Sequence, residues 1–247
     1  MTDLAANLRA VRARIDAAAR TAGRDPSSVT LLAVSKTWPA ADVRALAALG
    51  QRDFGENRAQ ELVDKAAQLT DPADRVLRWH FIGQLQRNKA AAVARLGAVV
   101  HSVDRDSLAR VLDRVGQQQG RPVEVFVQVD LGGPAGDLAT RGGRPPDDVP
   151  ALADLVAGSA GLALRGLMAV APRDSDPGPA FERLAAVAAR VRADHPEAVD
   201  VSAGMSSDLE AAIAAGATVV RVGTALFGDR PLPSGEIREH QPPESHQ

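Results

Sequence analysis

The sequence has 247 residues, 45% of them hydrophobic but only 3% aromatic, so one large domain with an aliphatic core is expected. Lysine and arginine total 29 against 31 aspartates and glutamates, and the net charge of −2 disfavours nucleic-acid and anionic-membrane partners. Cysteine is absent, which excludes disulfides, thiolate nucleophiles and thiolate metal sites.

The first twenty residues predict an amphipathic helix that packs on a larger body. Leu4, Leu8, Val11 and Ile15 recur at helical spacing. The segment lacks the apolar core of a signal peptide, and no run in the sequence approaches the length of a membrane span. We therefore expect a cytoplasmic protein.

Short apolar or β-branched runs alternate with alanine-rich helical segments along the rest of the chain. The predicted strands are Leu31–Ser35, Asp53–Gly55, Arg78–Ile82, Val99–Val103, Val123–Val129, Leu164–Val170, Val199–Ala203 and Val219–Val222. The predicted helices are Ala40–Leu49, Arg58–Leu69, Asn88–Leu96, Asp106–Gln118, Val149–Ala157, Ala180–Asp194 and Asp208–Ala215. Eight βα units favour a single α/β (β/α)8 TIM barrel with an extra N-terminal helix, while an open doubly wound sheet is the alternative.

Two segments interrupt this rhythm. Gly132–Pro146 is rich in glycine, proline and aspartate and predicts a long loop after the fifth strand. Arg230–Gln247 contains four prolines and few apolar residues. We expect one barrel domain over residues 1–230 and a disordered tail over residues 231–247.

Lys36 ends the first predicted strand, where barrel active sites are built. A lysine at this position can act as a nucleophile toward a carbonyl group. It can equally leave the sheet for solvent, and position alone favours that second interpretation.

Small residues follow the last two predicted strands and lead into helices, where barrels commonly bind phosphate. Backbone N–H groups there, with the hydroxyls of Ser206 and Thr224 beside Gly223, predict an anion site. Ser207 and Glu210 instead match an S-x-x-E capping box, so we expect Ser207 to cap the helix.

Closure of the barrel would place the eighth strand beside the first, so that Arg221 approaches the site that Lys36 enters. Asn57 follows the second strand and can contact a ligand there, although Glu56 and Asn57 can also cap the next helix. His80 lies inside the third strand and is interpreted as a core histidine. No histidines or carboxylates have the spacing of metal ligands, and no metal is expected.

The motifs AVSKTWP, FGENRAQE, WHFIGQLQRNK, LRGLMAV and GMSSDLEAAIAAGATVVRVGTALFG occur in this order. Together they resemble the pyridoxal phosphate homeostasis proteins, the YggS-like group, over residues 31–227. The resemblance implies a fold-type III barrel similar to the N-terminal domain of alanine racemase. It also implies a carrier or regulator of pyridoxal 5′-phosphate (PLP) without established turnover.

The resemblance further implies roles for the residues at the strand ends. Lys36 would hold PLP as a Schiff base and Arg221 would face the pyridine nitrogen, with Asn57 beside the ring. The phosphate-binding residues would be Ser206, Gly223 and Thr224. Possible partners are then PLP itself, amino acids and PLP-requiring apo-enzymes, and we expect a monomer.

The same resemblance bears on catalysis. Alanine racemase uses a tyrosine as its second base, supplied with the help of a C-terminal β-domain, and this sequence contains no tyrosine. We therefore expect no catalytic residue and exchange of the cofactor when an amine displaces Lys36. Three alternatives remain: a PLP-dependent amino-acid racemase that uses His80 or another base, a Schiff-base aldolase of sugar phosphates, and a pure interaction protein.

Overall fold

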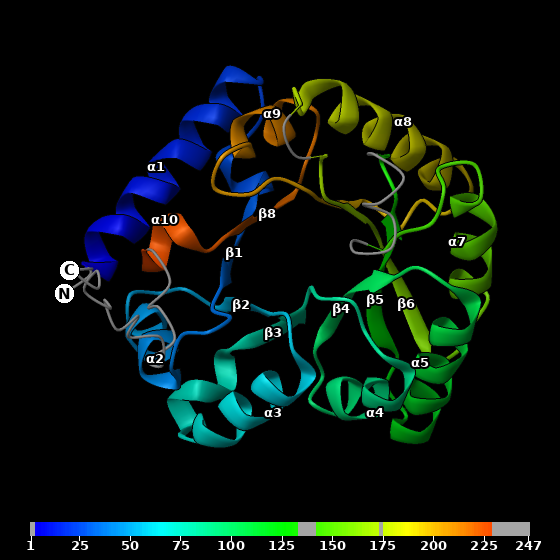
Figure 1. Cartoon of the computed structure of the whole chain (residues 1–247), viewed down its shortest axis with the longest axis horizontal. Coiled ribbons are helices and arrows are strands. Elements are labelled where there is room, and N and C mark those ends of the chain that lie inside the picture. The colour runs from blue at the N-terminus through cyan, green and yellow to red at the C-terminus, as the bar shows by residue number, and fades with distance from the viewer. Residues whose placement is uncertain (1–2, 133–141, 173–174, 229–247) are drawn as a thin grey trace, which may run out of the picture.

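Eight parallel strands close into a barrel in the computed structural model, which describes residues 3–132, 142–172 and 175–228 (Figure 1). The strands are β1 (Thr30–Val34), β2 (Asp53–Glu56), β3 (Arg78–Phe81), β4 (Val99–Val103), β5 (Val123–Val129), β6 (Leu162–Ala169), β7 (Asp200–Ser202) and β8 (Val219–Val222). They pair in chain order, and β8 pairs with β1 to close the sheet. The predicted barrel is confirmed, and the open doubly wound sheet is excluded.

Helices surround the barrel as an outer layer (Figure 1). They are α1 (Leu4–Thr21), α2 (Ala40–Ala48), α3 (Ala59–Gln68), α4 (Arg87–Arg95), α5 (Asp106–Gln119), α7 (Val149–Ala157), α8 (Gly178–Asp194), α9 (Leu209–Ala214) and α10 (Thr224–Phe227), with the 3-10 turns η1 (Pro26–Ser28) and η2 (Pro72–Val76). The ends of the seven helices predicted between strands differ by no more than two residues from those observed. The periodicity of the sequence was therefore sufficient to locate them.

The helix α5 shows why these segments fold as they do. Leu108, Leu112 and Val115 recur at helical spacing, and all three are buried against the barrel. Burial of each such side chain stabilises the fold by about 1.5–3 kcal/mol. The helix ends at Gly120, whose left-handed backbone (φ 63°) is one that glycine adopts without strain.

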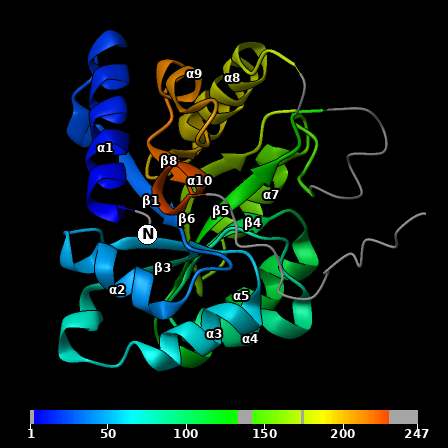
Figure 2. The ribbon, with the colours of Figure 1, turned by 60° about the vertical axis from the view of Figure 1, so that its left-hand side comes forward.

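The N-terminal helix α1 is the amphipathic helix that the sequence predicts. Leu8, Val11 and Ile15 are buried along one face, together with Ala19, and Leu4 packs at the edge of the core. This face lies against α9 and α10, which are the last two helices of the described chain (Figure 1, Figure 2). The helix therefore covers the side of the barrel at which the chain closes on itself.

The interior of the barrel is not purely aliphatic. Among all the described residues, the buried ones include ionisable side chains from β2, β3, β4, β8, α3 and η2, a type that in most domains remains at the surface. The buried polar and charged residues are Ser35, Gln51, Glu56, Lys65, Asp74, His80, His101, Ser102, Gln128, Ser202 and Arg221. Such groups are expected inside a protein only where they have partners.

The segment predicted as a long loop after β5 is described only in part. Residues 133–141 lie outside the described residues, but the chain beyond them returns along β5. The Arg144 N–H donates to Gln128 O, and the Asp130 N–H donates to Arg144 O, each at 2.8 Å. The tail predicted over residues 231–247 also lies outside the described residues.

Among the helices that are described, none combines the length and the apolar character needed to cross a bilayer.

Candidate functional site

A cavity of about 490 Å³ opens at the carboxyl ends of β1 and β8, on the face where barrels of this kind carry out their chemistry. Residues from β1, β8 and the segments after β1, β3, β7 and α10 surround it. They are Val34, Lys36, Trp38, Ile82, Met205, Ser206, Ser207, Arg221, Gly223, Thr224 and Gly228. The cavity therefore collects five of the six predicted site residues, and only Asn57 is missing from its lining.

Lys36 lies in a tight turn directly after β1. The Trp38 N–H donates to Ser35 O at 3.1 Å and closes the turn around the lysine. Thr37 has a φ of 70°, which makes it the one non-glycine residue at positive φ within the described chain. A β-branched residue adopts this conformation only when its surroundings impose it. The turn that carries the half-buried Lys36 is thus held in a fixed shape.

A buried ionic cluster, the Lys65 cluster, imposes that shape. Lys65 Nζ donates to Glu56 Oε1 and to Ser35 O at 2.6 Å, and to Glu61 Oε1 at 2.8 Å. Glu56 also accepts from Ser35 Oγ at 2.7 Å, and Glu61 accepts from the Thr37 N–H. The cluster therefore binds the residue on each side of Lys36 to α3 and β2.

Burial governs the protonation of Glu56 in this cluster. It raises the pKa of the Glu56 carboxyl, and the hydrogen bonds from Lys65 and Ser35 oppose that rise. The second oxygen, Oε2, is buried and accepts no hydrogen bond from the described residues. The alternative role in capping is wrong, because α3 begins at Ala59 without a side-chain cap and the Glu56 side chain, at the end of β2, is paired with Lys65 of α3.

Arg221 is the buried cation of the opposite wall. Its Nη1 donates to Ser202 O at 2.6 Å and to Ser202 Oγ at 2.9 Å, and its Nη2 donates to Ala169 O at 2.7 Å. Desolvation by burial lowers the pKa of Arg221 to about 10, so the guanidinium remains charged at neutral pH. Its Nε–H has no hydrogen-bond acceptor among the described residues, although Arg221 lines the cavity. A charged donor is therefore available to a ligand.

The segments after β7 and β8 form a wall of small residues. A Cβ at Gly223 would lie 3.3 Å from Val34 O, so a larger residue there would crowd the end of β1. Ser206 approaches the Ala225 N–H with its Oγ at 3.5 Å and accepts from Arg14 through its backbone oxygen at 3.0 Å. Hydroxyl groups and backbone amides therefore face the cavity where the sequence predicts an anion site.

The predicted capping box of Ser207 and Glu210 is wrong. Glu210 pairs with Arg14 of α1 at 2.9 Å, and α9 begins at Leu209 with no side-chain cap. The turn before α9 is instead fixed by Asp208, which accepts from the Met205 N–H at 2.5 Å. Ser207 is consequently left facing the cavity, where it joins Ser206.

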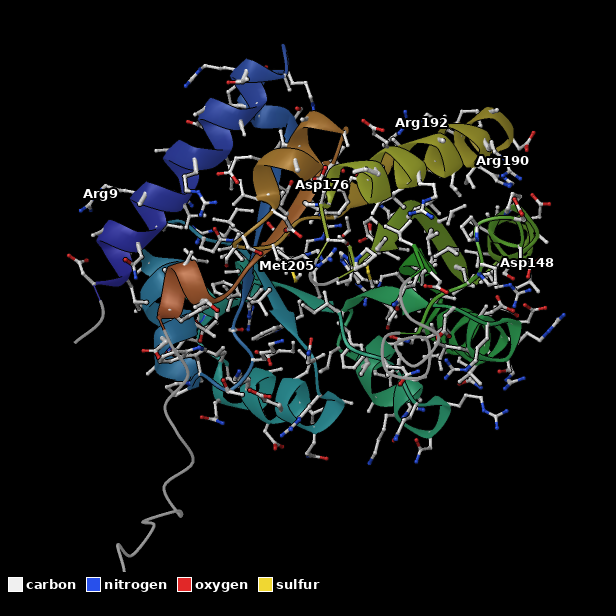
Figure 3. All side chains as sticks on the ribbon, turned by 45° about the horizontal axis from the view of Figure 1, so that its top comes forward. Arg9, Asp148, Asp176, Arg190, Arg192 and Met205 are labelled. Carbon is white, nitrogen blue, oxygen red and sulfur yellow. The ribbon has the colours of Figure 1, made fainter. Side chains whose placement is uncertain are left out.

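Several lining residues were not predicted from the sequence. Trp38 stacks on Phe227 of α10 with ring centroids 5.5 Å apart, which joins the Lys36 turn to the end of the described chain. Met205, labelled in Figure 3, lies near the middle of the ring of helices, whereas the labelled Arg9 and Arg190 lie at its periphery. The rarity of aromatic residues and the position of Trp38 two residues after Lys36 were signals that could have identified it.

His80 occupies the position that the sequence predicts for a core histidine. It is 4% exposed, and its two ring nitrogens lie 2.9 Å from His101 Nε2 and 3.0 Å from Asp53 Oδ1. His80 is not among the residues that line the cavity. Its partners therefore lie inside the barrel rather than at the site.

Comparisons with known proteins agree with this geometry. The family model described as "Alanine racemase, N-terminal domain" matches residues 6–231. A pyridoxal phosphate homeostasis protein of Pseudomonas aeruginosa is 48% identical over 236 residues, which cover 93% of this chain and 97% of that protein. A protein of the same name from Escherichia coli is 41% identical and covers 93% of this chain and 98% of its own length.

Solved structures with a similar fold point to the same family. PipY of Synechococcus elongatus, determined with PLP bound, superposes with a TM-score of 0.79 and 38% identity, covering 92% of this chain and all of its own. Alanine racemase of Corynebacterium glutamicum shares the fold with a TM-score of 0.65 at 18% identity, and this chain spans 63% of it. The chain belongs to the pyridoxal phosphate homeostasis proteins, a family built on the barrel of the alanine racemase N-terminal domain.

Proposed function

We propose that this chain binds PLP through Lys36 and acts in PLP homeostasis as a carrier or regulator, without turnover of its own. One observation carries the proposal: a primary amine, a buried guanidinium and a wall of hydroxyls and small residues line a single cavity. These are Lys36, Arg221, Ser206, Gly223 and Thr224. The names of the relatives and the PLP bound to PipY support the choice of ligand.

The donors of the cavity fit the functional groups of PLP. The cofactor supplies an aldehyde that condenses with an amine and releases water, and Lys36 is the amine that lines the cavity. Ser206, Gly223 and Thr224 offer hydroxyls and backbone amides to the phosphate. Arg221 would direct its Nε–H at the pyridine nitrogen. We retain Asn57 as a contact to the ring, although it lies outside the cavity lining.

The positive charge of Arg221 argues against stabilisation of a carbanion at this site. PLP enzymes stabilise a carbanion by drawing electrons into a protonated pyridine ring. A guanidinium beside the ring nitrogen disfavours that proton, because two cations would share a buried site. Arg221 hydrogen-bonds only to backbone and hydroxyl oxygens among the described residues, and the charge of Asp208 only partly opposes the lowering of its pKa by burial.

The lining also offers no second acid or base for racemisation. Among the described residues that line the cavity there is no histidine, aspartate or glutamate, and the sequence contains no tyrosine. His80, the base named in the racemase alternative, has both ring nitrogens engaged with His101 and Asp53. Removal and return of a proton on opposite faces of a substrate needs two such groups. These observations support binding without turnover.

Reduction of the PLP-treated protein with borohydride, followed by peptide mapping, tests the proposal. We expect a pyridoxyl group on Lys36 and on no other lysine. The Lys36→Ala variant should lose the adduct and the visible colour but keep weaker, reversible affinity for PLP, because the phosphate contacts do not depend on the covalent bond. A colourless wild-type protein without an adduct would overturn the proposal.

Two further measurements separate the alternatives. Deuterium exchange at the α-carbon of alanine at an enzyme-like rate would establish the racemase instead. A sugar-phosphate aldolase would form a borohydride-trapped adduct with its substrate and would not show the visible absorption of bound PLP. We expect neither result.

A further inference from the structure

A chain of hydrogen bonds crosses the barrel from the start of β2 to β8. Asp53 Oδ1 lies 3.0 Å from His80 Nε2, and His80 Nδ1 lies 2.9 Å from His101 Nε2. His101 Nδ1 lies 3.0 Å from Ser202 Oγ, which accepts from Arg221 Nη1 at 2.9 Å. These five residues, the histidine chain, come from β2, β3, β4, β7 and β8. They connect the amino-terminal end of the barrel with a wall of the cavity.

The partners fix the direction of every hydrogen bond in the histidine chain. The Asp53 carboxylate only accepts, so His80 must donate from Nε2. A neutral His80 then accepts at Nδ1, and His101 must donate from its own Nε2. His101 in turn accepts at Nδ1, so Ser202 donates its hydroxyl hydrogen there and accepts from Arg221.

The opposite direction does not satisfy the same groups. If His80 carried protons on both nitrogens, His101 would donate to Ser202 Oγ, which already accepts from Arg221. The hydroxyl hydrogen of Ser202 would then have no acceptor among the described residues. An unsatisfied buried donor costs about 1–3 kcal/mol. The structure therefore favours two neutral rings, each protonated on Nε2.

The environment of the two rings keeps them neutral. Burial lowers the pKa of His80, although Asp53 opposes this shift, and Arg78 and Glu124 act on the ring with opposite signs. Burial lowers the pKa of His101 further, and His80, Arg221 and Arg78 add to the effect. His101 is fully buried and stacks on Phe126 with centroids 4.2 Å apart.

A metal site does not account for the two histidines. Among the described residues no three histidine, aspartate or glutamate side chains are placed to hold a metal ion. Two apolar aromatic rings in place of His80 and His101 would fill the same space without any hydrogen-bond partners. A histidine pair with only some of its hydrogen bonds satisfied would destabilise the core. The complete matching of donors and acceptors points to a role at Arg221, where the chain ends.

We propose that His80 and His101 are positioning residues that hold Arg221 through Ser202 and so fix the donor that Arg221 presents to the pyridine nitrogen of PLP. The inference rests on the proposed function, because it names what orients one wall of that site. Ser202 O and Ala169 O set the plane of the guanidinium, and Ser202 Oγ, polarised by the two rings, holds Nη1. The remaining Nε–H then faces the ligand.

The protonation of the two rings can be measured without any cofactor. Imidazole nitrogen NMR of the PLP-free wild-type protein should show both His80 and His101 as neutral rings with the proton on Nε2 at neutral pH. A proton on Nδ1, or a cationic ring at neutral pH, would reverse the direction of the chain and overturn the proposal. This measurement needs no variant and therefore does not depend on whether a variant folds.

Variants test the effect on the ligand. His101→Phe keeps the ring stacked on Phe126 but removes both hydrogen bonds, so Ser202 no longer holds Arg221 in one orientation. We expect PLP to bind about tenfold more weakly, as for one lost hydrogen bond to a charged group. The pH dependence of the visible absorption of the reconstituted protein should shift as well.

A matched serine pair provides the control. Ser202→Ala breaks the chain next to Arg221, whereas Ser102→Ala removes a buried hydroxyl of β4 that has no hydrogen-bond partner among the described residues. We expect Ser202→Ala to behave as His101→Phe, and Ser102→Ala to bind PLP as the wild type does. A folded His101→Phe or Ser202→Ala protein with wild-type affinity and pH dependence would show that the chain only stabilises the core, and would refute the proposal.

The two proposals fail separately. If wild-type protein forms no pyridoxyl adduct on Lys36, the proposed function is wrong whatever the state of the rings. If the adduct forms on Lys36 but the variants leave affinity and spectrum unchanged, only the positioning role of His80 and His101 is refuted.

Discussion

The site is held from two sides by buried polar networks of different chemistry. On the β1–β2 side, the Lys65 cluster holds the turn of Lys36 with ion pairs between side chains that are 0–20% exposed. On the β7–β8 side, the histidine chain holds Arg221 through a serine and two backbone oxygens. The first network pairs one ammonium group with two carboxyl groups, whereas in the second no carboxylate hydrogen-bonds to the guanidinium.

This difference matches what each side has to present to a ligand. Under the proposed function Lys36 needs a fixed position and an amine that can lose a proton, and the Lys65 cluster fixes the turn through Ser35 O and the Thr37 N–H. Arg221 needs its positive charge, and neutral acceptors orient a guanidinium without cancelling that charge. The barrel therefore uses ion pairs to fix geometry and neutral groups to preserve charge.

Removal of Lys65 should break the first network and produce the largest effect. Lys65→Met leaves the Glu56 carboxylate buried without its cation, and we expect a loss of about 3–5 kcal/mol in the free energy of unfolding. Urea denaturation measures this loss. Pyridoxyl incorporation at Lys36 in the folded fraction should also fall, because Ser35 O and Glu61 lose the side chain that joins them.

Two controls accompany this prediction. Adding Glu56→Gln to Lys65→Met removes the unpaired charge and should restore much of the stability. Arg78→Met breaks an exposed pair with Glu124 of the same length, 2.6 Å, and should change stability by less than about 1 kcal/mol. Equal losses from the buried and the exposed pair would contradict the assigned role of burial.

The pH dependence of stability should separate the two networks, with a smaller effect than Lys65→Met. His80 and His101 have lowered pKa values in the folded state, so below the ordinary value of 6.5 the unfolded chain binds more protons. Their contribution to stability is therefore present above pH 6.5 and is lost as the pH falls through the folded pKa values. Glu56 has a raised pKa, so its contribution is present below 4.5 and is lost as the pH rises through the folded value.

Thermal unfolding of matched variants measures this contrast. His101→Phe should flatten the loss of stability on acidification below pH 6.5, whereas Glu56→Gln should remove a change of the opposite sign, the loss of stability as the pH rises above 4.5. Identical pH profiles for His101→Phe and wild type would show that the fold does not lower the pKa of His101.

Much of the fold could be predicted because periodicity and residue type are local properties. The eight strands and the interstrand helices follow from alternation of apolar runs with alanine-rich segments, and Lys36 and Arg221 follow from the closure of β8 on β1. The presence of Ser206, Gly223 and Thr224 in the cavity lining follows from the small residues after the last two strands. These inferences need only the order of the elements.

The two networks could not be predicted because they depend on side chains that are far apart in sequence. Nothing local to Lys65 shows that it reaches Ser35, and His101 meets Ser202 across 101 positions. Local patterns also gave a wrong prediction where a tertiary contact replaces a local one. Glu210 matches a capping box in the sequence but forms an ion pair with Arg14 of α1. A helix cap is a weak interaction that one bidentate arginine can replace.

The smallest expected effect concerns the strain beside Lys36. Thr37→Gly removes a left-handed strain of about 1–2 kcal/mol but adds about 0.5–1 kcal/mol of unfolded-state entropy, so stability should rise by no more than about 1.5 kcal/mol. Thr37→Ala keeps the strain and should be neutral within about 0.5 kcal/mol. Both variants retain the backbone N–H that donates to Glu61, so both should form the Lys36 adduct as the wild type does. Loss of the adduct in Thr37→Gly alone would mean that the conformational restriction at Thr37, and not the Lys65 cluster, fixes the lysine.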